Sequence, residues 1–329
     1  MGGIEVGIAS VAVIVFLIYM GLYIPVALGL VSFLGVWLIR GNPDIAVALL
    51  SESIADTVSE LVFASVPLFA LMGLIVSKAG LGKDVYEVAN FAFYRIRGGL
   101  GIATVAANAI FASITGSSIA SASVFTRVAI PEMRRFGYKP RFTVGVVAGS
   151  SVLGMLIPPS AMLIIYAIVT EQSVGRMFIA GIIPGILLAF CFGILILFLA
   201  YAFPKYVGGQ DSADIAAEDW ANLTWMDLVK KIIPVIVLVL VVLGGIYGGV
   251  FTPTEAGAAG SLAALIIALL KSNFSWRDLW EVLVETGYIT ATILFLITTA
   301  SMYSRMLGVA ALPTVFGEWL SSFDLTLIQ

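Results

Sequence analysis

Hydrophobic residues dominate the chain in long runs that polar residues interrupt. Runs of about 17 to 25 mainly apolar residues, the length that crosses a bilayer as a helix, occur near residues 4–21, 23–39, 61–77, 142–170, 177–202, 232–250, 255–270 and 287–304. This pattern predicts an all-α, polytopic membrane protein. The first run lacks a basic flank and continues past Gly21 into a second run, so we interpret it as retained and not as a signal peptide.

The stretch from Gly99 to Pro131 departs from this pattern, because a polar tip, TGSS at 115–118, separates two shorter apolar arms. At about 1.5 Å per residue each arm is about 20 to 24 Å long, which is too short for a hydrocarbon core of about 30 Å. Basic residues flank both ends, at 95–97 and 134–135. The sequence therefore predicts a re-entrant helical hairpin over residues 99–133.

A second irregular stretch, GSSVLGMLIPPS at 149–160, interrupts the run at 142–170. Proline has no N–H and keeps the preceding residue out of the helical region, so Pro158 and Pro159 must end one half-helix, and another can begin near Ser160. Irregular backbone at membrane depth is tolerated only where it is buried in protein or lines a cavity. We therefore expect a discontinuous transmembrane helix over 142–170.

Each break presents two kinds of helix end. The carbonyls that end the first halves, with the hydroxyls of Ser117, Ser150 and Ser151, are oxygen ligands for a small cation. The helix N-termini near Ser118 and Ser160 offer amides and a positive dipole end to an anion such as a carboxylate. Together the breaks predict a cation-coupled anion transporter, although either one alone could be a simple bend.

Composition narrows the possible functions. The chain is 60% hydrophobic and contains no histidine, which excludes Ser-His-Asp and Cys-His catalysis and imidazole metal ligation. Cys191 is the only cysteine, so no thiolate site for a transition metal is expected. A net charge of −3 gives no indication that the protein binds nucleic acid. A serine hydrolase with a Ser-Lys pair is disfavoured, and we predict that the protein is not an enzyme.

Basic residues indicate the orientation. If the cluster between Arg127 and Arg141 is cytoplasmic, alternating spans leave only Arg40, Arg176 and Arg305, of 17 lysines and arginines, outside or within the membrane. The positive-inside rule then places the N-terminus outside. Snorkelling explains Arg127 better than substrate contact does.

Two further polar residues have more than one interpretation. Glu255 resembles an intramembrane acid, but TPTE places Thr252 at the N-cap, Pro253 at N1 and Glu255 at N3 of the following helix. We favour this structural capping box. Asn108 could either hydrogen-bond between helices or face the site.

Five segments of the chain form a familiar set: SVPLFALMGLIVSKAGL, RGGLGIATVAANAIFASITGSSIASAS, IPEMRRFGYKPRFTVGVVAGSSVLGMLIPPSAMLIIYAIVT, MFIAGIIPGILLAF and GGIYGGVFTPTEAGAAGSLAAL. Together they resemble the DctM-type large membrane subunit of tripartite ATP-independent periplasmic (TRAP) transporters. The resemblance implies an elevator-type secondary transporter with inverted repeats in a bacterial inner membrane, usually driven by sodium. It implies carboxylate substrates such as C4-dicarboxylates or sialic acids, an extracytoplasmic binding protein, a small membrane subunit, and no cofactor besides Na⁺.

The resemblance also suggests site residues. Cation binding is expected at Gly116, Ser117, Ser150, Ser151 and Gly154, and substrate binding at Ser118, Ser121, Pro158, Pro159 and Ser160. The chain departs from the family where it has Ser121 in place of an acid or threonine, Thr126 in place of glycine and Met155 in place of proline.

The sequence predicts four regions along the chain. They are scaffold spans at 1–98, a first transport unit at 99–175, connecting spans with an interfacial arm at 176–286, and the start of a second repeat at 287–329. Because no second hairpin follows, we expect the chain to be truncated at its C-terminus. Two alternatives stay open: an elevator-type anion symporter without a binding protein, and a truncated membrane scaffold that does not transport.

Overall fold

The computed structural model describes residues 2–209, 224–271 and 274–322. Within these ranges the chain is helical, and its one isolated β-bridge joins Tyr138 and Gly208. Among the described residues, five helices are long and apolar enough to cross a membrane, or six if a bent pair over 140–169 counts as one span. The all-α, multi-span prediction is therefore confirmed. Residues 210–223, within the connecting region predicted at 176–286, lie outside the described residues.

The chain divides into two compact units, and the first consists of residues 1–63 and 288–329. Its helices are α1 (Gly3–Tyr19), α2 (Ile24–Arg40), α3 (Pro43–Ser59), the second part of α17 (Trp276–Val309) and α18 (Leu312–Ser321). A glycine and an asparagine set the boundary between α2 and α3. Gly41 ends α2 in a left-handed conformation with φ +71°, and Asn42 caps α3 by accepting a hydrogen bond from the Asp44 amide at 2.8 Å.

Unit 1 is held together by close helix packing and by polar contacts to α17. A side chain at Gly35 of α2 would collide with Met306, which is fully buried together with Val36. Arg305 pairs with Glu52 at 3.1 Å and also with Asp56, both on α3. Arg305, which the charge pattern places outside or within the membrane, is therefore paired with two acidic residues.

Unit 2 comprises residues 64–287 and contains both predicted breaks. Its helices are α4 (Ser65–Lys78), α5 (Leu81–Phe93), α6 (Gly99–Thr115), α7 (Ser118–Arg135), α8 (Pro140–Ser151), α9 (Leu153–Leu156), α10 (Ala161–Val169), α11 (Val174–Ala202), α12 (Pro204–Val207), α14 (Trp225–Val239), α15 (Gly245–Tyr247), α16 (Pro253–Leu270) and the first part of α17. A 3₁₀ turn (Leu61–Ala64) precedes α4, and a π-helical turn (Leu240–Gly244) joins α14 to α15.

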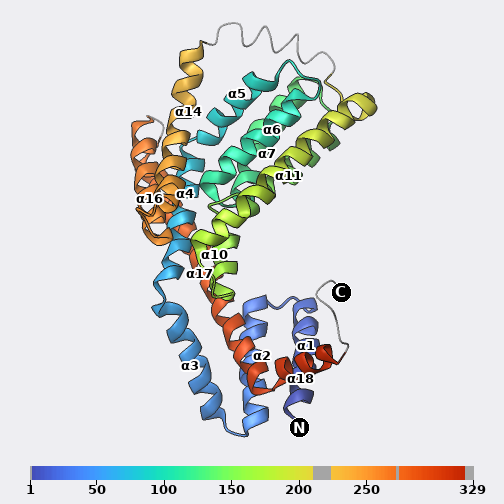
Figure 1. The fold of residues 1–329 in the computed structure, drawn as a ribbon, viewed down its shortest axis with the longest axis vertical. Helices are drawn as coiled ribbons and strands as arrows, with labels where there is room; N and C mark the ends of the chain where they lie inside the picture. Colours follow the sequence, from blue (N-terminus) through green and yellow to red (C-terminus); the bar gives the residue numbers. More distant parts are fainter. Residues whose placement is uncertain (1, 210–223, 272–273, 323–329) are drawn as a thin grey trace. The chain divides into compact units, whose positions relative to one another are not determined.

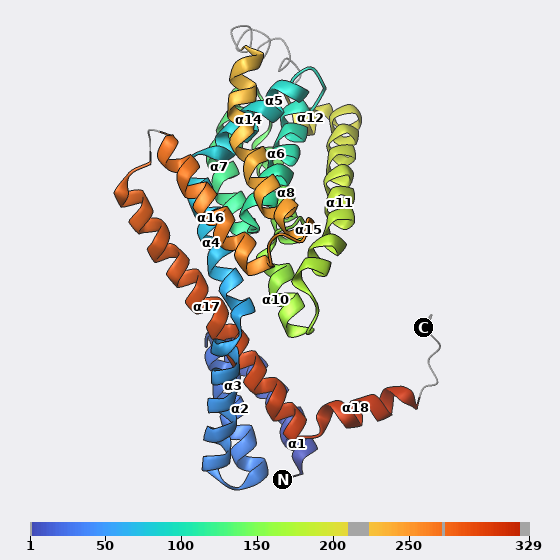
Figure 2. The same cartoon turned by 60° about the vertical axis from the view of Figure 1, so that its left-hand side comes forward.

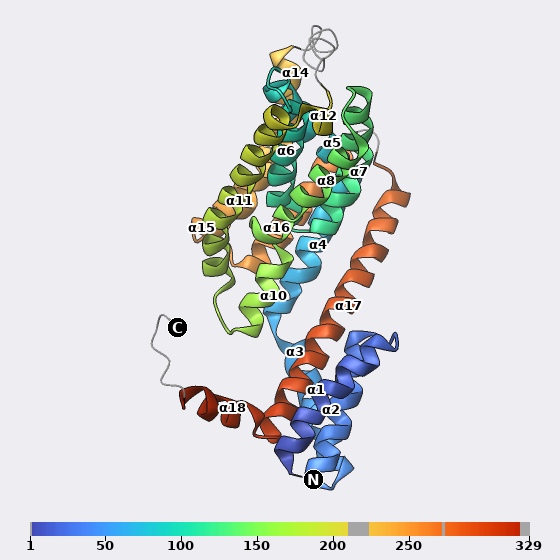
Figure 3. The same cartoon turned by 90° about the vertical axis from the view of Figure 1, so that its right-hand side faces the viewer.

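The helical hairpin α6–α7 lies at the centre of unit 2. Helix α6 packs against α5, α7, α8 and α11, and most of its residues are buried (Figures 1 and 3). Edge-to-face rings join the hairpin to α5, with Phe111 and Phe125 5.6 Å apart and Phe125 and Tyr86 6.4 Å apart. Helices α4 and α16 pack side by side next to this centre (Figure 2). Helix α6 is thus surrounded by other helices, whereas α7 keeps one exposed face.

Helix α11 has an apolar face that the described protein does not cover. Ile183 is 77% exposed, and Ile186 and Phe190 are more than 60% exposed. Such a surface is unfavourable in water and suits lipid contact. Together with the length of α11, this supports the prediction of a membrane-embedded unit.

Ion pairs connect α5 to its neighbours in unit 2. Asp84 pairs with Lys271 at the end of α16, and Glu87 pairs with Lys231 of α14. Helix α17 begins at Trp276 and continues past Gly287 to Val309, so the interfacial arm, which we expect at 275–287, coincides with the start of a longer helix. A single glycine costs a helix only about 1 kcal/mol relative to alanine, which is too little to end it.

Candidate functional site

The hairpin tip is a two-residue turn between α6 and α7. Gly116 ends α6 with φ +58°, a left-handed conformation that favours glycine, and its amide donates to the Ala112 carbonyl at 3.0 Å. Ser117 is extended and caps α7, because its hydroxyl accepts from the Ala120 amide at 3.3 Å. The polar residues that mark the tip in the sequence are therefore also its caps.

The discontinuous helix breaks where the two prolines stand. Helices α8 and α9 run to Leu156, the backbone is extended at Ile157, and α10 begins after Ser160, bent by 42° from the first half. The Pro158–Pro159 peptide bond is cis. The Ser160 hydroxyl donates to the Met155 carbonyl at 2.8 Å, so it binds one of the carbonyls freed by the break.

The hairpin tip and the helix break contact each other through two glycines. A side chain at Gly154 would lie 2.8 Å from the carbonyl carbon and oxygen of Ser117. A side chain at Gly116 would overlap the Pro159 carbonyl oxygen and lie 3.2 Å from the Ser160 Cα. In addition, the Ala161 amide donates to the Gly116 carbonyl at 3.2 Å. The structure thus brings two stretches of irregular backbone together.

Glycines of two neighbouring helices allow this close packing, and their role was missed in the sequence. A side chain at Gly73 of α4 would lie 2.8 Å from the Thr115 carbonyl oxygen. On α11, side chains at Gly181 and Gly185 would each come within 2.7 Å of Leu156 or Ile157. The spacing of Gly181 and Gly185, four residues apart on an apolar helix, is the signal that could have indicated a close helix contact.

The predicted cation-binding serines on α8 are both buried. Ser150 is 1% exposed, and its hydroxyl accepts from the Asn108 amide at 2.6 Å while donating to the Val146 carbonyl at 2.7 Å. Ser151 is 6% exposed, and its hydroxyl donates to the Ala148 carbonyl at 2.9 Å. Asn108 therefore links the hairpin to the discontinuous helix, which is the first of the two roles left open for it.

The residues predicted to bind substrate differ in burial. Ser121, Pro158, Pro159 and Ser160 are buried, whereas Ser118 is partly exposed at the start of α7. The amides of Met162 and Leu163, in the first turn of α10, make no backbone hydrogen bond within the described ranges. Partly exposed helix N-termini of this kind bind anions through free amides and the helix dipole.

Thr252 and Glu255 lie at the N-terminus of α16 and form a capping box. The Glu255 carboxylate accepts from the Thr252 amide at 2.8 Å, and the Glu255 amide donates to the Thr252 hydroxyl at 3.3 Å. The Glu255 carboxylate is therefore hydrogen-bonded within the first turn of its own helix.

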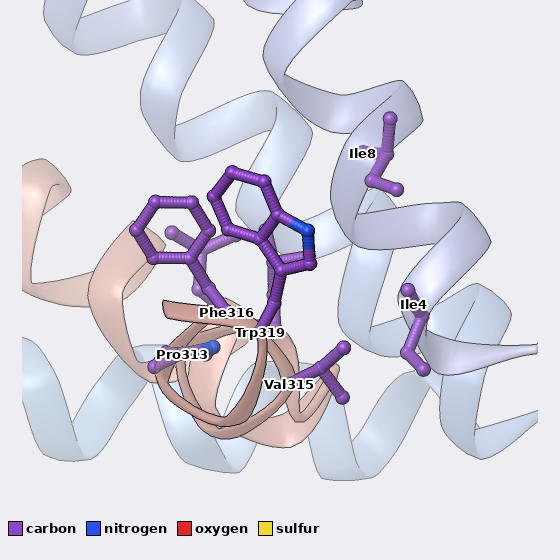
Figure 4. Close-up of a pocket in the computed structure, with 8 residues that line it drawn as sticks. Ile4, Ile8, Pro313, Val315, Phe316 and Trp319 are labelled. Carbon is purple, nitrogen blue, oxygen red and sulfur yellow. The ribbon is translucent and has the colours of Figure 1, made fainter. Parts of the chain in front are cut away.

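A pocket in unit 1 offers a different environment. It lies between α1 and α18, has a volume of about 510 Å³, and is lined by apolar residues that include Ile4, Ile8, Phe316 and Trp319 (Figure 4). The described residues that line it expose no polar surface to the pocket, so they offer no charge to hold a carboxylate or a cation. The contact between tip and break in unit 2 is therefore the better candidate site.

Comparison with known proteins identifies the family of the chain. A family-wide sequence profile described as "Tripartite ATP-independent periplasmic transporter, DctM component" matches residues 11–328. The chain is 32% identical over 290 residues to the C4-dicarboxylate TRAP transporter large permease protein DctM of Pseudomonas aeruginosa, covering 87% of this chain and 65% of the relative. It is 30% identical to the DctM permease of Rhodobacter capsulatus, covering 93% and 70%.

A third relative is named for ectoine and 5-hydroxyectoine instead of a C4-dicarboxylate. The ectoine/5-hydroxyectoine TRAP transporter large permease protein UehC of Ruegeria pomeroyi is 33% identical over 250 residues, covering 76% of this chain and 56% of the relative. The chain thus spans between 56% and 70% of the length of these three relatives. Because the profile covers nearly every residue, the chain belongs to the DctM component family of tripartite ATP-independent periplasmic transporters.

Proposed function

We propose that the chain is the large membrane subunit of a cation-coupled secondary transporter that imports small carboxylate-bearing anions. The family comprises transport permeases and not enzymes. The observation that carries the proposal is the direct backbone contact of the hairpin tip with the helix break, through Gly154 against Ser117 and Gly116 against Pro159. Broken helices that meet in this way let main-chain groups replace water around an ion and its substrate.

The coupling ion in this proposal is Na⁺. Its ligands would be drawn from oxygen atoms of Gly116, Ser117, Ser150, Ser151 and Gly154. Main-chain carbonyls suit a hard cation, and the ends of α6 and α9 provide carbonyls that no following helical turn uses. The close approaches of Gly154 to the Ser117 carbonyl and of Gly116 to the Pro159 carbonyl oxygen support this assignment, because they bring backbone of both breaks together.

The substrate in this proposal is an organic anion bound next to the cation. Ser118 and the N-terminal amides of α7 and α10 would bind one carboxylate, and Ser121, Pro158, Pro159 and Ser160 would shape the surrounding backbone. Two relatives carry C4-dicarboxylate in their names and a third carries ectoine, and all of these compounds contain a carboxylate group. A carboxylate is therefore the chemistry that these three relatives share.

The remaining features of the proposal follow from the family. The subunit would lie in the bacterial inner membrane with its N-terminus outside, and would move its substrate by an elevator mechanism. It would work with a small membrane subunit and receive substrate from an extracytoplasmic binding protein. Support comes from the family assignment and from the apolar helices of both units.

Sodium-dependent uptake into proteoliposomes tests the site. The full-length protein would be reconstituted with the small subunit and binding protein of its own system, and uptake of radiolabelled C4-dicarboxylate measured with and without a sodium gradient. Ser117→Phe is expected to abolish uptake, whereas Ser123→Phe, on the exposed face of the same helix, is expected to retain it. Unchanged uptake by Ser117→Phe would refute the site assignment.

The same assay separates the alternatives. Full uptake in the absence of the binding protein would favour a carrier that works alone. Failure of the full-length, correctly assembled system to transport any carboxylate would instead favour a membrane scaffold.

A further inference from the structure

Buried polar groups without hydrogen-bond partners gather where α5 packs against the hairpin. Among the described residues, the buried side-chain atoms without a partner are the Tyr86 hydroxyl, both amide atoms of Asn90, Oδ1 of Asn108 and Oγ of Ser121. Asn90, Asn108 and Ser121 have no exposed surface. Buried amides and hydroxyls are costly without a partner, and ordered water molecules commonly provide one.

Several of these groups form a line inside unit 2. Tyr86 and Asn90 are four residues apart on α5, and Thr104 and Asn108 are four residues apart on α6, so each pair shares a helix face. The Thr104 side chain interacts electrostatically with the Tyr86 hydroxyl, although the Tyr86 hydroxyl has no completed hydrogen bond. Beyond Thr104, the Asn108 side-chain amide donates to the Ser150 hydroxyl at 2.6 Å. We call Ser150, Asn108, Thr104, Tyr86 and Asn90 the polar file.

The polar file runs from the helix break toward the surface of unit 2. One end is Ser150, in the last turn of α8. Toward the other end, one helical turn before Asn90, Tyr86 is affected by the negative charge of Glu132 of α7, whose side chain is 31% exposed. Burial, with Glu132 adding to it, raises the pKa of Tyr86, so its hydroxyl stays protonated and can donate to a water molecule.

The spacing of the polar file suits bridging water. Side chains four residues apart on a helix are about 6 Å apart, and two consecutive hydrogen bonds of about 2.8 Å each cover nearly that distance. The Thr104 hydroxyl donates to the Leu100 carbonyl at 2.7 Å, which leaves its oxygen able to accept from water. Each position in the line therefore offers the two or more polar partners that a buried water needs.

We propose that the polar file binds a chain of exchangeable water molecules that connects the space beside Ser150 with the surface at Glu132. This gives the interior of unit 2 a route to solvent that does not pass the hairpin tip. The inference goes beyond the proposed function, because it requires neither sodium binding nor transport. Its failure and the failure of the proposed function can therefore be observed separately.

Radiolytic hydroxyl-radical labelling of the purified full-length protein in lipid nanodiscs tests the proposal. Radicals form from bound water and modify adjacent side chains, so Tyr86 is expected to be modified at least tenfold faster than Phe178. Phe178 is a matched control, because it is equally buried in unit 2 but packs against the apolar ring of Phe69. Equal and slow modification of the two rings would overturn the proposal.

Rapid mixing with H₂¹⁸O before the pulse tests the connection to solvent, and it needs no variant. Incorporation of ¹⁸O at Tyr86 within milliseconds is expected if the water exchanges along the file. Modification of Tyr86 with ¹⁶O alone would show trapped water and overturn the proposed connection.

A pair of threonine variants locates the route. Thr104→Val removes a hydroxyl of the file and is expected to reduce Tyr86 labelling to the rate of Phe178. Thr143→Val removes an equally buried hydroxyl of α8, which donates to the Pro140 carbonyl at 2.9 Å, and should leave Tyr86 labelling unchanged. Equal effects of the two variants would contradict the assignment of the file.

Discussion

Gly154 of the discontinuous helix lies directly against the backbone of Ser117 at the hairpin tip. A Cβ atom at Gly154 would be 2.8 Å from the Ser117 carbonyl and 2.9 Å from the Ser118 amide. These are backbone atoms, so they cannot move aside as a flexible side chain could. The contact between tip and break therefore depends on a hydrogen atom at this position.

Gly154→Ala is expected to separate the tip from the break and to reduce sodium-dependent uptake at least tenfold, while the protein still inserts and folds. The matched control is Gly145→Ala on α8, because a Cβ atom there would meet no atom of the described residues within 4 Å. That change should preserve uptake and stabilise the helix by about 0.5 to 1 kcal/mol. Wild-type uptake by Gly154→Ala would show that the contact is dispensable.

Gly116→Ala combines backbone strain with a collision against Pro159, and a control can separate the two effects. Gly41 has a similar left-handed conformation, with φ +71° compared with +58° at Gly116, but a Cβ atom at Gly41 would meet nothing within 4 Å. Gly41→Ala should therefore cost only the strain, about 1 to 2 kcal/mol. Gly116→Ala is expected to cost more and to abolish uptake.

The measurement is uptake combined with the unfolding midpoint of the purified protein. Equal losses of stability in Gly41→Ala and Gly116→Ala, with uptake intact in both, would mean that the approach of Gly116 to Pro159 has no functional role.

Local sequence signals were sufficient for the hairpin and the helix break. Glycine, serine and proline determine backbone conformation within a few residues, so the turn at Gly116 and the break at Pro158 could be located from the chain alone. The apolar runs likewise predicted the long helices, because crossing a bilayer requires about 20 apolar residues.

Long-range contacts could not be predicted in this way. The bond between Asn108 and Ser150 joins residues 42 positions apart, and Arg305 meets acidic residues of α3 roughly 250 positions away. Which face of a helix meets which neighbour depends on packing of the whole unit, and one sequence does not reveal it. The burial of Ser121 and Ser160 likewise depends on the packing of the whole unit.

Ser150→Ala is expected to cost more stability than Ser151→Ala, although both remove one buried hydroxyl. Loss of the Ser150 hydroxyl leaves the Asn108 amide without a partner inside the protein, which costs about 1 to 3 kcal/mol. Ser151 bonds a carbonyl of its own helix, so its loss should cost about 0.5 to 1.5 kcal/mol.

A double-mutant cycle with Asn108→Ala measures this coupling from the unfolding free energy in detergent. We expect the double variant with Ser150→Ala to lose less stability than the sum of the single changes, by about 0.5 to 3 kcal/mol. Ser151→Ala with Asn108→Ala should be nearly additive. Additivity in both cycles would mean that the 2.6 Å contact contributes no net stability.

Glu255→Gln distinguishes a structural cap from an acid that handles ions. Glutamine keeps the side-chain carbonyl that accepts from the Thr252 amide but removes the negative charge, so the capping box survives. Uptake and its dependence on sodium should then stay within about twofold of the wild type, which is less than 0.5 kcal/mol. Glu255→Ala removes the acceptor and should lower stability by about 1 kcal/mol. If Glu255→Gln instead abolishes uptake while the unfolding midpoint is unchanged, the charge itself is needed, and Glu255 belongs to the transport machinery and not only to the N-terminus of α16.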